Sequence, residues 1–248
     1  MYRFFVDASQ IEDGSVLIEG KDAHHIKNVL RMKKGETIYL SCGDEWEYTC
    51  DIEEFLQNGV RAKIIDIQKP GQELPCKITL FQCLPKKEKM ELIIQKSVEL
   101  GVFSIVPVES ARCIAKNDPK KIDNKLSRWN AIAQAAAKQS KRLIEPTVEK
   151  PVAFKEALKL LKEKDVAFVP YERAEGMKKT RELFQNIASG QSVGLLIGPE
   201  GGFEEKEIEA AKEAGLETVS LGKRILRTET AGPAVLAILM YLLEQDGE

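Results

Sequence analysis

The hydrophobic and polar residues of this 248-residue chain follow two different rhythms along its length. Up to residue 70, short runs rich in Val, Ile, Tyr and Thr alternate with turn signals such as Asp13-Gly14, Gly43-Asp44 and Asn58-Gly59. The pattern predicts strands over residues 15–20, 36–43, 47–55 and 60–68, and one helix over 23–32. Several short strands at this spacing predict a small β-barrel.

From residue 76 onward, strand-like runs alternate with amphipathic stretches of helical period. The predicted strands cover residues 77–84, 102–108, 166–170, 192–198 and 218–222, and the predicted helices cover 87–101, 120–140, 154–164, 180–188, 204–215 and 228–245. Such alternation is typical of an α/β domain with a mainly parallel sheet. Because Lys69-Pro70-Gly71 has the composition of a linker, we expect one domain over 1–71 and another over 72–248.

Composition narrows the class of protein. The hydrophobic fraction is 43% and the charged fraction is 31%, as in soluble globular proteins. No apolar run reaches the roughly 20 residues of a membrane span, and the N-terminus lacks the apolar core of a secretory signal. We therefore expect a cytoplasmic protein with no membrane partner.

The cysteines and histidines argue against a metal site. The five cysteines include no CxxC pair, which predicts free thiols in a reducing compartment. The only two histidines, His24 and His25, are adjacent, so their side chains point apart on a helix or a strand. We therefore expect no bound metal.

The net charge of −2 conceals an uneven distribution along the chain. Residues 1–72 carry a net −4, residues 84–150 a net +6, and residues 151–248 a net −4. The middle third is thus the best candidate for contact with phosphates. A solvated basic helix face explains the same charges at least as well.

The carboxyl ends of the predicted strands are the expected ligand sites, because open α/β sheets bind their ligands there. After the strand 192–198, the pair Gly201 and Gly202 permits positive φ and a close approach of the backbone to a ligand. No phosphate-loop or dinucleotide fingerprint is present, and Glu200 with the glutamates that follow would repel a phosphate. An adenosyl group with a cationic sulfonium fits better, although a tight turn without a ligand explains the glycines equally well.

The segment after the last predicted strand carries more chemistry. Thr228 and Thr230 are both possible N-caps of the apolar helix that follows, which would place Pro233 in its first turn or just past it. Arg227 and Glu229 would then lie near the helix start. They form either a weak surface ion pair or an arginine and a carboxylate at the mouth of a pocket.

Together these segments resemble the RsmE-type ribosomal RNA methyltransferases of the SPOUT superfamily. The resemblance rests on LLIGPEGGF at residues 195–203, followed about twenty residues later by SLGKRILRTETA at residues 220–231. Further matches in register cover nearly the whole chain, at residues 2–6, 23–36, 89–102, 109–113, 128–129 and 135–142. The glycine motif alone is moderately specific, and the two motifs in this order are strongly so.

The resemblance implies a fold and an activity. The C-terminal part would be a SPOUT domain with a parallel sheet and a deep trefoil knot, a departure from the rule that chains avoid knots. The N-terminal part would be a PUA-like β-barrel that binds RNA, and the protein would be a homodimer. The implied reaction is methylation of N3 of uridine 1498 in the 16S ribosomal RNA of the small subunit, with S-adenosylmethionine as the methyl donor.

The resemblance also implies roles for individual residues. Glu229 would take the proton from uracil N3, with Glu200 as its rival, and Arg227 would offset charge on the uracil oxygens. The cofactor would be bound by Pro170, Leu196, Ile197, Gly198, Glu200, Gly201, Gly202, Ser220, Leu221, Gly222, Ile225 and Leu226. RNA would be contacted by Arg3, His25, Arg31, Arg112, Gln139, Ser140 and Arg142.

Three other functions compete with this interpretation. A SPOUT enzyme acting on transfer RNA or on a ribose 2′-oxygen would share the fold and the cofactor, and the N-terminal match disfavours it. A non-catalytic RNA-binding or ribosome-assembly protein would not need both glycine-bearing segments intact. An enzyme acting on nucleotide phosphates would need a phosphate loop, which the sequence lacks.

Overall fold

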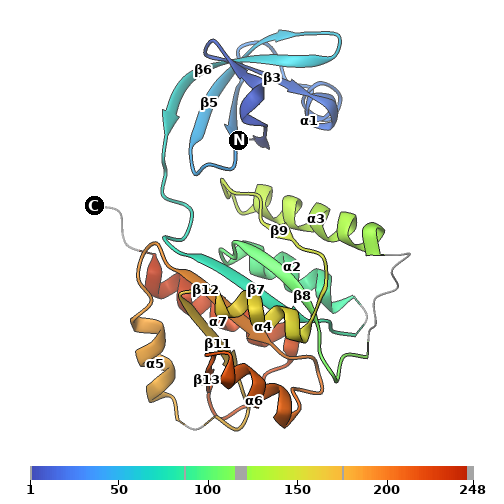
Figure 1. The fold of residues 1–248 in the computed structure, drawn as a ribbon. Helices are drawn as coiled ribbons and strands as arrows, with labels where there is room; N and C mark the ends of the chain where they lie inside the picture. The colour runs from blue at the N-terminus through green and yellow to red at the C-terminus, as the bar shows by residue number, and fades with distance from the viewer. Residues whose placement is uncertain (1, 87, 115–121, 175, 245–248) are drawn as a thin grey trace. The chain divides into compact units, whose positions relative to one another are not determined.

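The computed structural model describes residues 2–86, 88–114, 122–174 and 176–244, which form two compact units (Figure 1). Unit 1 comprises Met1–Glu73 with Ala137–Glu145, and unit 2 comprises Leu74–Ala136 with Pro146–Glu248. The division falls two residues after the expected boundary. The short segment 137–145, which we expected in the second domain, belongs to unit 1.

Unit 1 is built on one six-stranded sheet. Its strands run in the order β1-β4-β5-β6-β3-β2, and only β1 and β4 pair in parallel. The strands are β1 Arg3–Phe5, β2 Ile11–Glu12, β3 Ser15–Glu19, β4 Thr37–Ser41, β5 Glu47–Phe55 and β6 Gly59–Gln68. Asp13 and Gly14 both have positive φ and turn the chain from β2 into β3, as a two-residue Asp-Gly hairpin turn requires.

The sheet of unit 1 buries alternate residues of its strands. Val16 and Ile18 of β3 and Ile38 and Leu40 of β4 are at most 1% exposed, so each strand turns one face to a shared core. The predicted helix 23–32 proves shorter and less regular. A helix α1 (Gly20–His24) continues into one π-helical turn (His25–Val29), and the chain leaves the helix where Arg31 adopts positive φ.

Unit 2 contains the predicted parallel sheet. Its strand order is β10-β8-β7-β12-β11-β13, with β9 paired to β8, and the pairing is parallel throughout. The strands are β7 Lys77–Cys83, β8 Ser104–Glu109, β9 Thr147–Val148, β10 Val152–Ala153, β11 Val166–Pro170, β12 Ser192–Ile197 and β13 Glu217–Val219. The helices are α2 Lys89–Glu99, α3 Ile122–Gln139, α4 Phe154–Lys162, α5 Lys178–Gln185, α6 Glu205–Glu213 and α7 Thr228–Leu243.

Helices cover both faces of this sheet. On one face, α4 and α6 pack in a core cluster with alternate strand residues that include Phe81, Val106 and Leu196. On the other face, α7 lies over Leu80 of β7 and Ile197 of β12, and packs beside α2. The strands are buried on both sides, which explains their nearly continuous hydrophobic runs. In the described residues, no helix is long and apolar enough to cross a membrane.

The start of α7 differs from both expected alternatives. Its N-cap is Arg227, so neither Thr228 nor Thr230 has that position. The Thr228 side chain is instead buried and hydrogen-bonded to other elements. Pro233 consequently lies in the second turn, inside the helix, where its missing N–H leaves the carbonyl of Glu229 without the usual helical donor.

Candidate active site at the strand ends

A cleft of about 420 Å³ lies beyond the carboxyl ends of β11, β12 and β13. The glycine loop, residues 198–203, forms one wall, and the segment after β13, residues 220–227, forms another. Its lining residues are Lys89, Pro170, Tyr171, Glu172, Ile197, Gly198, Pro199, Glu200, Gly202, Phe203, Ser220, Leu221, Gly222, Lys223, Arg224, Ile225, Leu226, Arg227, Thr228 and Ala231. A parallel sheet brings such strand ends to one edge, which is why segments distant in sequence meet here.

Most residues predicted to bind the cofactor or to act in catalysis line this cleft. Three of them, Leu196, Gly201 and Glu229, do not. Leu196 points its side chain into the core, where it is fully buried. Gly201 lies on the outer side of the loop, where its carbonyl accepts a 2.8 Å hydrogen bond from Arg112. Glu229 reaches the cleft only through Lys89, to which its carboxylate is bonded.

The glycine loop is held in a tight turn. Gly202 donates a 2.9 Å hydrogen bond to the carbonyl of Pro199 and has a φ of +66°, a conformation that favours glycine. A Cβ atom on Gly202 would meet nothing within 4 Å and would project into open space. On Gly198, by contrast, a Cβ would come within 3.0 Å of the Phe203 ring, so this position also suits glycine.

The wall formed by residues 220–227 is anchored by α5. The Thr180 hydroxyl donates to the Ser220 carbonyl at 2.9 Å and accepts from the Ser220 amide at 3.1 Å. Gly222 follows with a φ of +109°, and a Cβ there would also meet nothing within 4 Å. Two walls of the cleft therefore carry a glycine whose missing side chain leaves space for a ligand.

Lys89, at the start of α2, joins two carboxylates at the cleft. Its Nζ lies 3.1 Å from Oε1 of Glu200 and 3.1 Å from Oε2 of Glu229. The side chains of Lys89, Glu200 and Glu229 are 29%, 24% and 16% exposed, so all three are largely shielded from water. The backbone N–H of Lys86 donates a further 3.0 Å hydrogen bond to Glu200.

These contacts change the acidity of the three groups. Hydrogen bonds to Glu229 and Glu200 raise the pKa of Lys89. Burial acts to raise the pKa of Glu229, but its own backbone N–H, Lys89 and Arg227 lower it on balance. Burial also acts to raise the pKa of Glu200. The backbone N–H groups of Glu200 and Lys86 and the ammonium group of Lys89 outweigh burial and lower this pKa. Both carboxylates are therefore ionised at neutral pH and are weak bases in this state.

Arg227 is an exposed cation at the edge of the cleft. Its side chain is 81% exposed, and its guanidinium group only just reaches Glu229, at 4.0 Å. Arg227 and Glu229 therefore do not form a simple surface ion pair, because the closer partner of Glu229 is Lys89, at 3.1 Å. The guanidinium group of Arg227 is therefore largely accessible to solvent.

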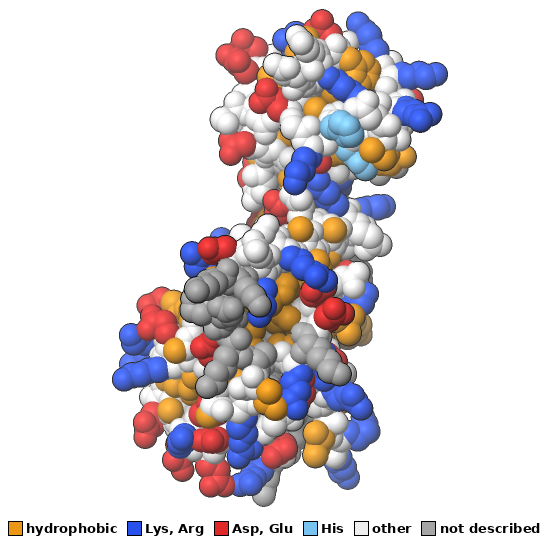
Figure 2. Space-filling view, turned by 90° about the vertical axis from the view of Figure 1, so that its right-hand side faces the viewer, with side chains coloured by type: hydrophobic (Ala, Val, Ile, Leu, Met, Phe, Trp, Pro, Cys, Tyr) orange, Lys and Arg blue, Asp and Glu red, His pale blue; other side chains and the backbone are white. Residues whose placement is uncertain are grey.

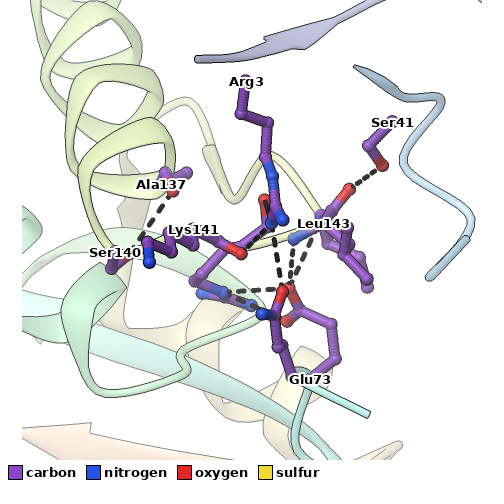
Figure 3. Close-up of polar contacts among 10 residues, drawn as sticks. Arg3, Ser41, Glu73, Ala137, Ser140, Lys141 and Leu143 are labelled. Atoms are coloured by element: carbon purple, nitrogen blue, oxygen red, sulfur yellow. Dashed lines mark hydrogen bonds and ion pairs between the residues drawn. The ribbon is translucent and has the colours of Figure 1, made fainter. Parts of the chain in front are cut away.

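Two of the residues expected to contact RNA, Arg3 and Arg142, form contacts inside unit 1, and Figure 3 shows Arg3 pointing toward the backbone of Lys141. The Arg3 side chain is 9% exposed and forms an ion pair with Glu47, while its guanidinium group also bonds the carbonyl of Lys141. The Arg142 side chain is 5% exposed and pairs with Glu73. For Arg3 and Arg142 the structure thus shows a role in holding unit 1 together, because partnered and buried guanidinium groups are not presented to a phosphate.

The other expected RNA contacts are more accessible. His25, Arg31 and Gln139 are exposed in unit 1, and Arg112 is exposed in unit 2. The Ser140 hydroxyl donates a long 3.4 Å hydrogen bond to the Ala137 carbonyl. Figure 2 shows the two histidines beside lysine and arginine side chains on one face of unit 1.

The thiols and acids of the described residues form no cluster of three or more possible metal ligands. The five cysteines are free. Cys113 differs from the others, because a hydrogen bond from the buried Cys83 thiol lowers its pKa to about 6 despite partial burial, with help from Ser110 and the backbone of Leu84.

Sequence reasoning did not identify Lys89 or Thr180 as parts of the site. Lys89 lies in a helix that matched the family, but nothing in its local sequence distinguishes it from the other lysines of that stretch. Thr180 looks like an ordinary helix residue. Only contacts across the fold show that these two side chains hold the walls of the cleft.

Two family models match the chain. The RNA methyltransferase domain matches residues 72–240, and the RNA methyltransferase PUA domain matches residues 18–55. A Bacillus subtilis protein named ribosomal RNA small subunit methyltransferase E is 35% identical, with 98% of each chain covered.

Solved structures agree with these matches in fold. A ribosomal RNA small subunit methyltransferase E from Neisseria gonorrhoeae, bound to S-adenosyl methionine, has a TM-score of 0.84 at 32% identity over 98% of both chains. A Legionella pneumophila protein solved with the bound cofactor SAM has a TM-score of 0.82 at 31% identity over 97% of both chains. Matches of this extent cover both units.

Proposed function

The chain belongs to the family of ribosomal RNA small subunit methyltransferases E, and from this premise we propose that it methylates N3 of uridine 1498 in 16S ribosomal RNA, with S-adenosylmethionine as the donor. The observation that carries the proposal is the cleft at the ends of β11, β12 and β13. Most of its lining residues come from the same two segments, 195–203 and 220–231, on which the family resemblance rests.

The residues of the cleft fit S-adenosylmethionine. Gly202 and Gly222 each leave open space on one wall of the cleft, which gives a planar adenosyl group room at these two positions. The carboxylate of Glu200 lines the cleft and suits a ligand that carries a positive sulfonium. Backbone groups of Ile197, Gly198, Leu221, Ile225 and Leu226 are the proposed contacts to adenine and ribose.

When bound, S-adenosylmethionine supplies a methyl group attached to a positively charged sulfur. The chain's own residues must then hold the uracil and remove the proton from its N3. We propose that Glu229 removes this proton and that Arg227 stabilises the negative charge that develops on the uracil oxygens. Because the pKa of Glu229 is lowered, it is an adequate base only if Arg227 also makes the uracil N3 more acidic.

The RNA contacts of unit 1 are assigned to its exposed basic face. The proposed residues are His25 and Arg31, already expected from the sequence, together with the exposed Lys21, Lys33 and Lys34. Lysine and arginine here would mainly bind phosphates, so RNA affinity should fall steeply with salt. Gln139, Ser140 and Arg112 remain proposed contacts.

The homodimer implied by the resemblance has a candidate surface on α7. Ile238, Tyr241 and Leu242 are 43%, 81% and 41% exposed, and their spacing places them on one stripe of the helix. An apolar stripe of this kind suits a second copy of the same helix. A Tyr241→Lys variant should run as a monomer in sedimentation velocity if α7 forms the dimer interface.

The trefoil knot is likewise a proposal. After β13 at the edge of the sheet, the chain returns across the ends of β11 and β12, so that Thr228 bonds Gly198 and Gln82 at the sheet centre. This return path supports a threaded C-terminal segment.

We also propose that the protein works in the cytoplasm, because its proposed substrate is ribosomal RNA.

Calorimetry and methyl transfer together test the proposed activity. The protein should bind S-adenosylmethionine, and it should transfer a radiolabelled methyl group to the 16S RNA of small subunits lacking the modification. Binding without transfer to any RNA would contradict the enzymatic role. Absence of cofactor binding would favour a non-catalytic RNA-binding protein instead.

A further inference from the structure

Lys89 is the one described side chain that is bonded to both acidic residues proposed for the site. Glu200 belongs to the glycine loop and Glu229 to the first turn of α7, and the same ammonium group lies 3.1 Å from a carboxylate oxygen of each. Both elements line the cleft, the loop through residues such as Gly198 and Glu200 and α7 through Thr228 and Ala231. The lysine therefore connects parts of the chain that are not otherwise joined through side-chain charges.

The two carboxylates would not hold these positions without the cation. Both oxygens contact the same Nζ, so two like charges lie only a few ångströms apart in a largely shielded place. Like charges at such a separation repel strongly where water is scarce. Removing the ammonium group should therefore drive the Glu200 and Glu229 side chains apart, while the hydrogen bond from Thr228 to Gly198 still joins the first residues of α7 and of the loop.

Among the described residues, Arg227 is the one cation besides Lys89 that is paired with either carboxylate. From the segment before α7, Arg227 approaches Glu229 only at 4.0 Å and is 81% exposed. From the residues before α2, Lys86 contributes its backbone N–H to Glu200. On α2 itself, Glu91 is paired with Arg128, so it does not compete for Lys89.

We infer that Lys89 is a positioning residue of the methyl-transfer site, which fixes the glycine loop against the start of α7 by bonding Glu200 and Glu229 at once. This inference rests on the proposed function, because it concerns the same cleft. Lys89 acts through the two carboxylates and needs no contact with the methyl group. Loss of Lys89 should therefore weaken the binding of the product, S-adenosylhomocysteine, as well as slow methyl transfer.

Binding of S-adenosylhomocysteine measured by calorimetry is the first test, because this product lacks the sulfonium charge. We expect Lys89→Met to weaken its binding about tenfold or more through loss of positioning, and Lys89→Arg to restore most of the affinity. Lys96→Met is the matched control, because Lys96 lies on the same helix and pairs with Glu99 away from the cleft. Normal product binding by Lys89→Met would overturn the inference.

A titration of the ligand-free protein is the second test and needs no activity. The carboxyl carbons of ¹³C-labelled glutamate can be followed by NMR, with Glu200→Gln and Glu229→Gln used for assignment. Both carboxylates should titrate below their ordinary range in the wild type, and both midpoints should rise in Lys89→Met. Unchanged midpoints would show that Lys89 does not hold these groups together in solution.

The outcomes separate this inference from the proposed function. If the wild type binds neither S-adenosylmethionine nor its product, the proposed function fails. If the wild type binds both and Lys89→Met binds them equally well, only the role of Lys89 fails. Should Lys89→Met unfold, Lys89→Arg and Lys89→Gln, compared by circular dichroism before binding is measured, keep the test decisive.

Discussion

The hydroxyl of Thr228 donates a 2.7 Å hydrogen bond to the carbonyl of Gly198, and this bond ties the first residue of α7 to the first residue of the glycine loop. The same hydroxyl accepts a 2.9 Å bond from the side-chain amide of Gln82, at the end of β7. Thr228 is only 6% exposed, and Gln82 is fully buried. The two motifs that identify the family are thus parts of one hydrogen-bonded unit.

Replacing Thr228 by valine tests this link, because valine keeps the shape and removes both hydrogen bonds. The buried amide of Gln82 and the carbonyl of Gly198 would each lose a partner, which should lower the free energy of unfolding by about 1–3 kcal/mol. Cofactor affinity measured by calorimetry should fall as well. Thr230→Val, at an exposed position on the same helix, should change neither quantity.

Gly222→Ala should impair cofactor binding more than its backbone strain alone explains. The φ of +109° is unfavourable for alanine, and the new methyl group would be added to a residue that lines the cleft. Gly215→Ala is a matched control, because Gly215 has a φ of +94° and equally open surroundings but lies outside the cleft. Equal loss of affinity in both variants would mean that strain, and not occupied space, is responsible.

Glu229→Gln and Arg227→Ala should separate catalysis from cofactor binding. A missing base should reduce the rate constant of methyl transfer about 10²–10⁴-fold, since general bases contribute effects of this size. Arg227→Ala should also slow transfer while cofactor affinity stays nearly normal, because its side chain is 81% exposed. Transfer by Glu229→Gln at a near-normal rate would remove Glu229 as the base and leave Glu200 as the candidate.

Cys113 should be the most reactive thiol at neutral pH. Because its pKa is lowered to about 6, mainly by a hydrogen bond from Cys83, its thiolate predominates above that pH, while the thiols of the other cysteines stay protonated. Iodoacetamide labelling followed by mass spectrometry should show a rate that rises around pH 6. Cys83→Ala should move this rise to higher pH and Cys76→Ala should not; a wild-type rise near pH 9 would contradict the lowered pKa.

The buried ion pair of Arg142 with Glu73 should matter far more to unit 1 than a surface pair. Arg142→Met leaves the carboxylate of Glu73 buried without its cation, which should cost about 3–5 kcal/mol. Arg61→Met breaks an exposed pair with Glu54 and should cost at most about 1 kcal/mol.

The two tryptophans allow this difference to be measured in unit 1 alone. Trp46 lies in unit 1 and Trp129 in unit 2, so a Trp129→Phe background leaves the fluorescence of Trp46 as the reporter. Urea unfolding in this background should give a much lower midpoint for Arg142→Met than for Arg61→Met. Similar midpoints would show that the buried pair does not hold unit 1 together.

The sequence was informative where local pattern and structure coincide. Fully buried parallel strands appear as hydrophobic runs, so β7, β11 and β12 were predicted close to their observed bounds. The two-residue strands β9 and β10 carry no detectable period and were missed. Strand ends and paired glycines are both visible in sequence, so the glycine loop could be expected at a strand end, where it lines the cleft.

The rest of the site depends on contacts between distant residues. Lys89 and Glu229 are 140 residues apart, and no local pattern connects them. Arg3 and Arg142 looked like RNA contacts because charge alone cannot distinguish an exposed arginine from one buried against a carboxylate. The N-cap of α7 was misplaced because the Thr228 hydroxyl bonds Gly198 and not its own helix.

The most direct test of the proposed activity is mass spectrometry of 16S ribosomal RNA from cells that lack this protein. One methyl group should be missing from N3 of uridine 1498, and the wild-type protein should restore it while Glu229→Gln does not. A fully methylated uridine 1498 in the deletion strain would show that this protein does not carry out the proposed reaction.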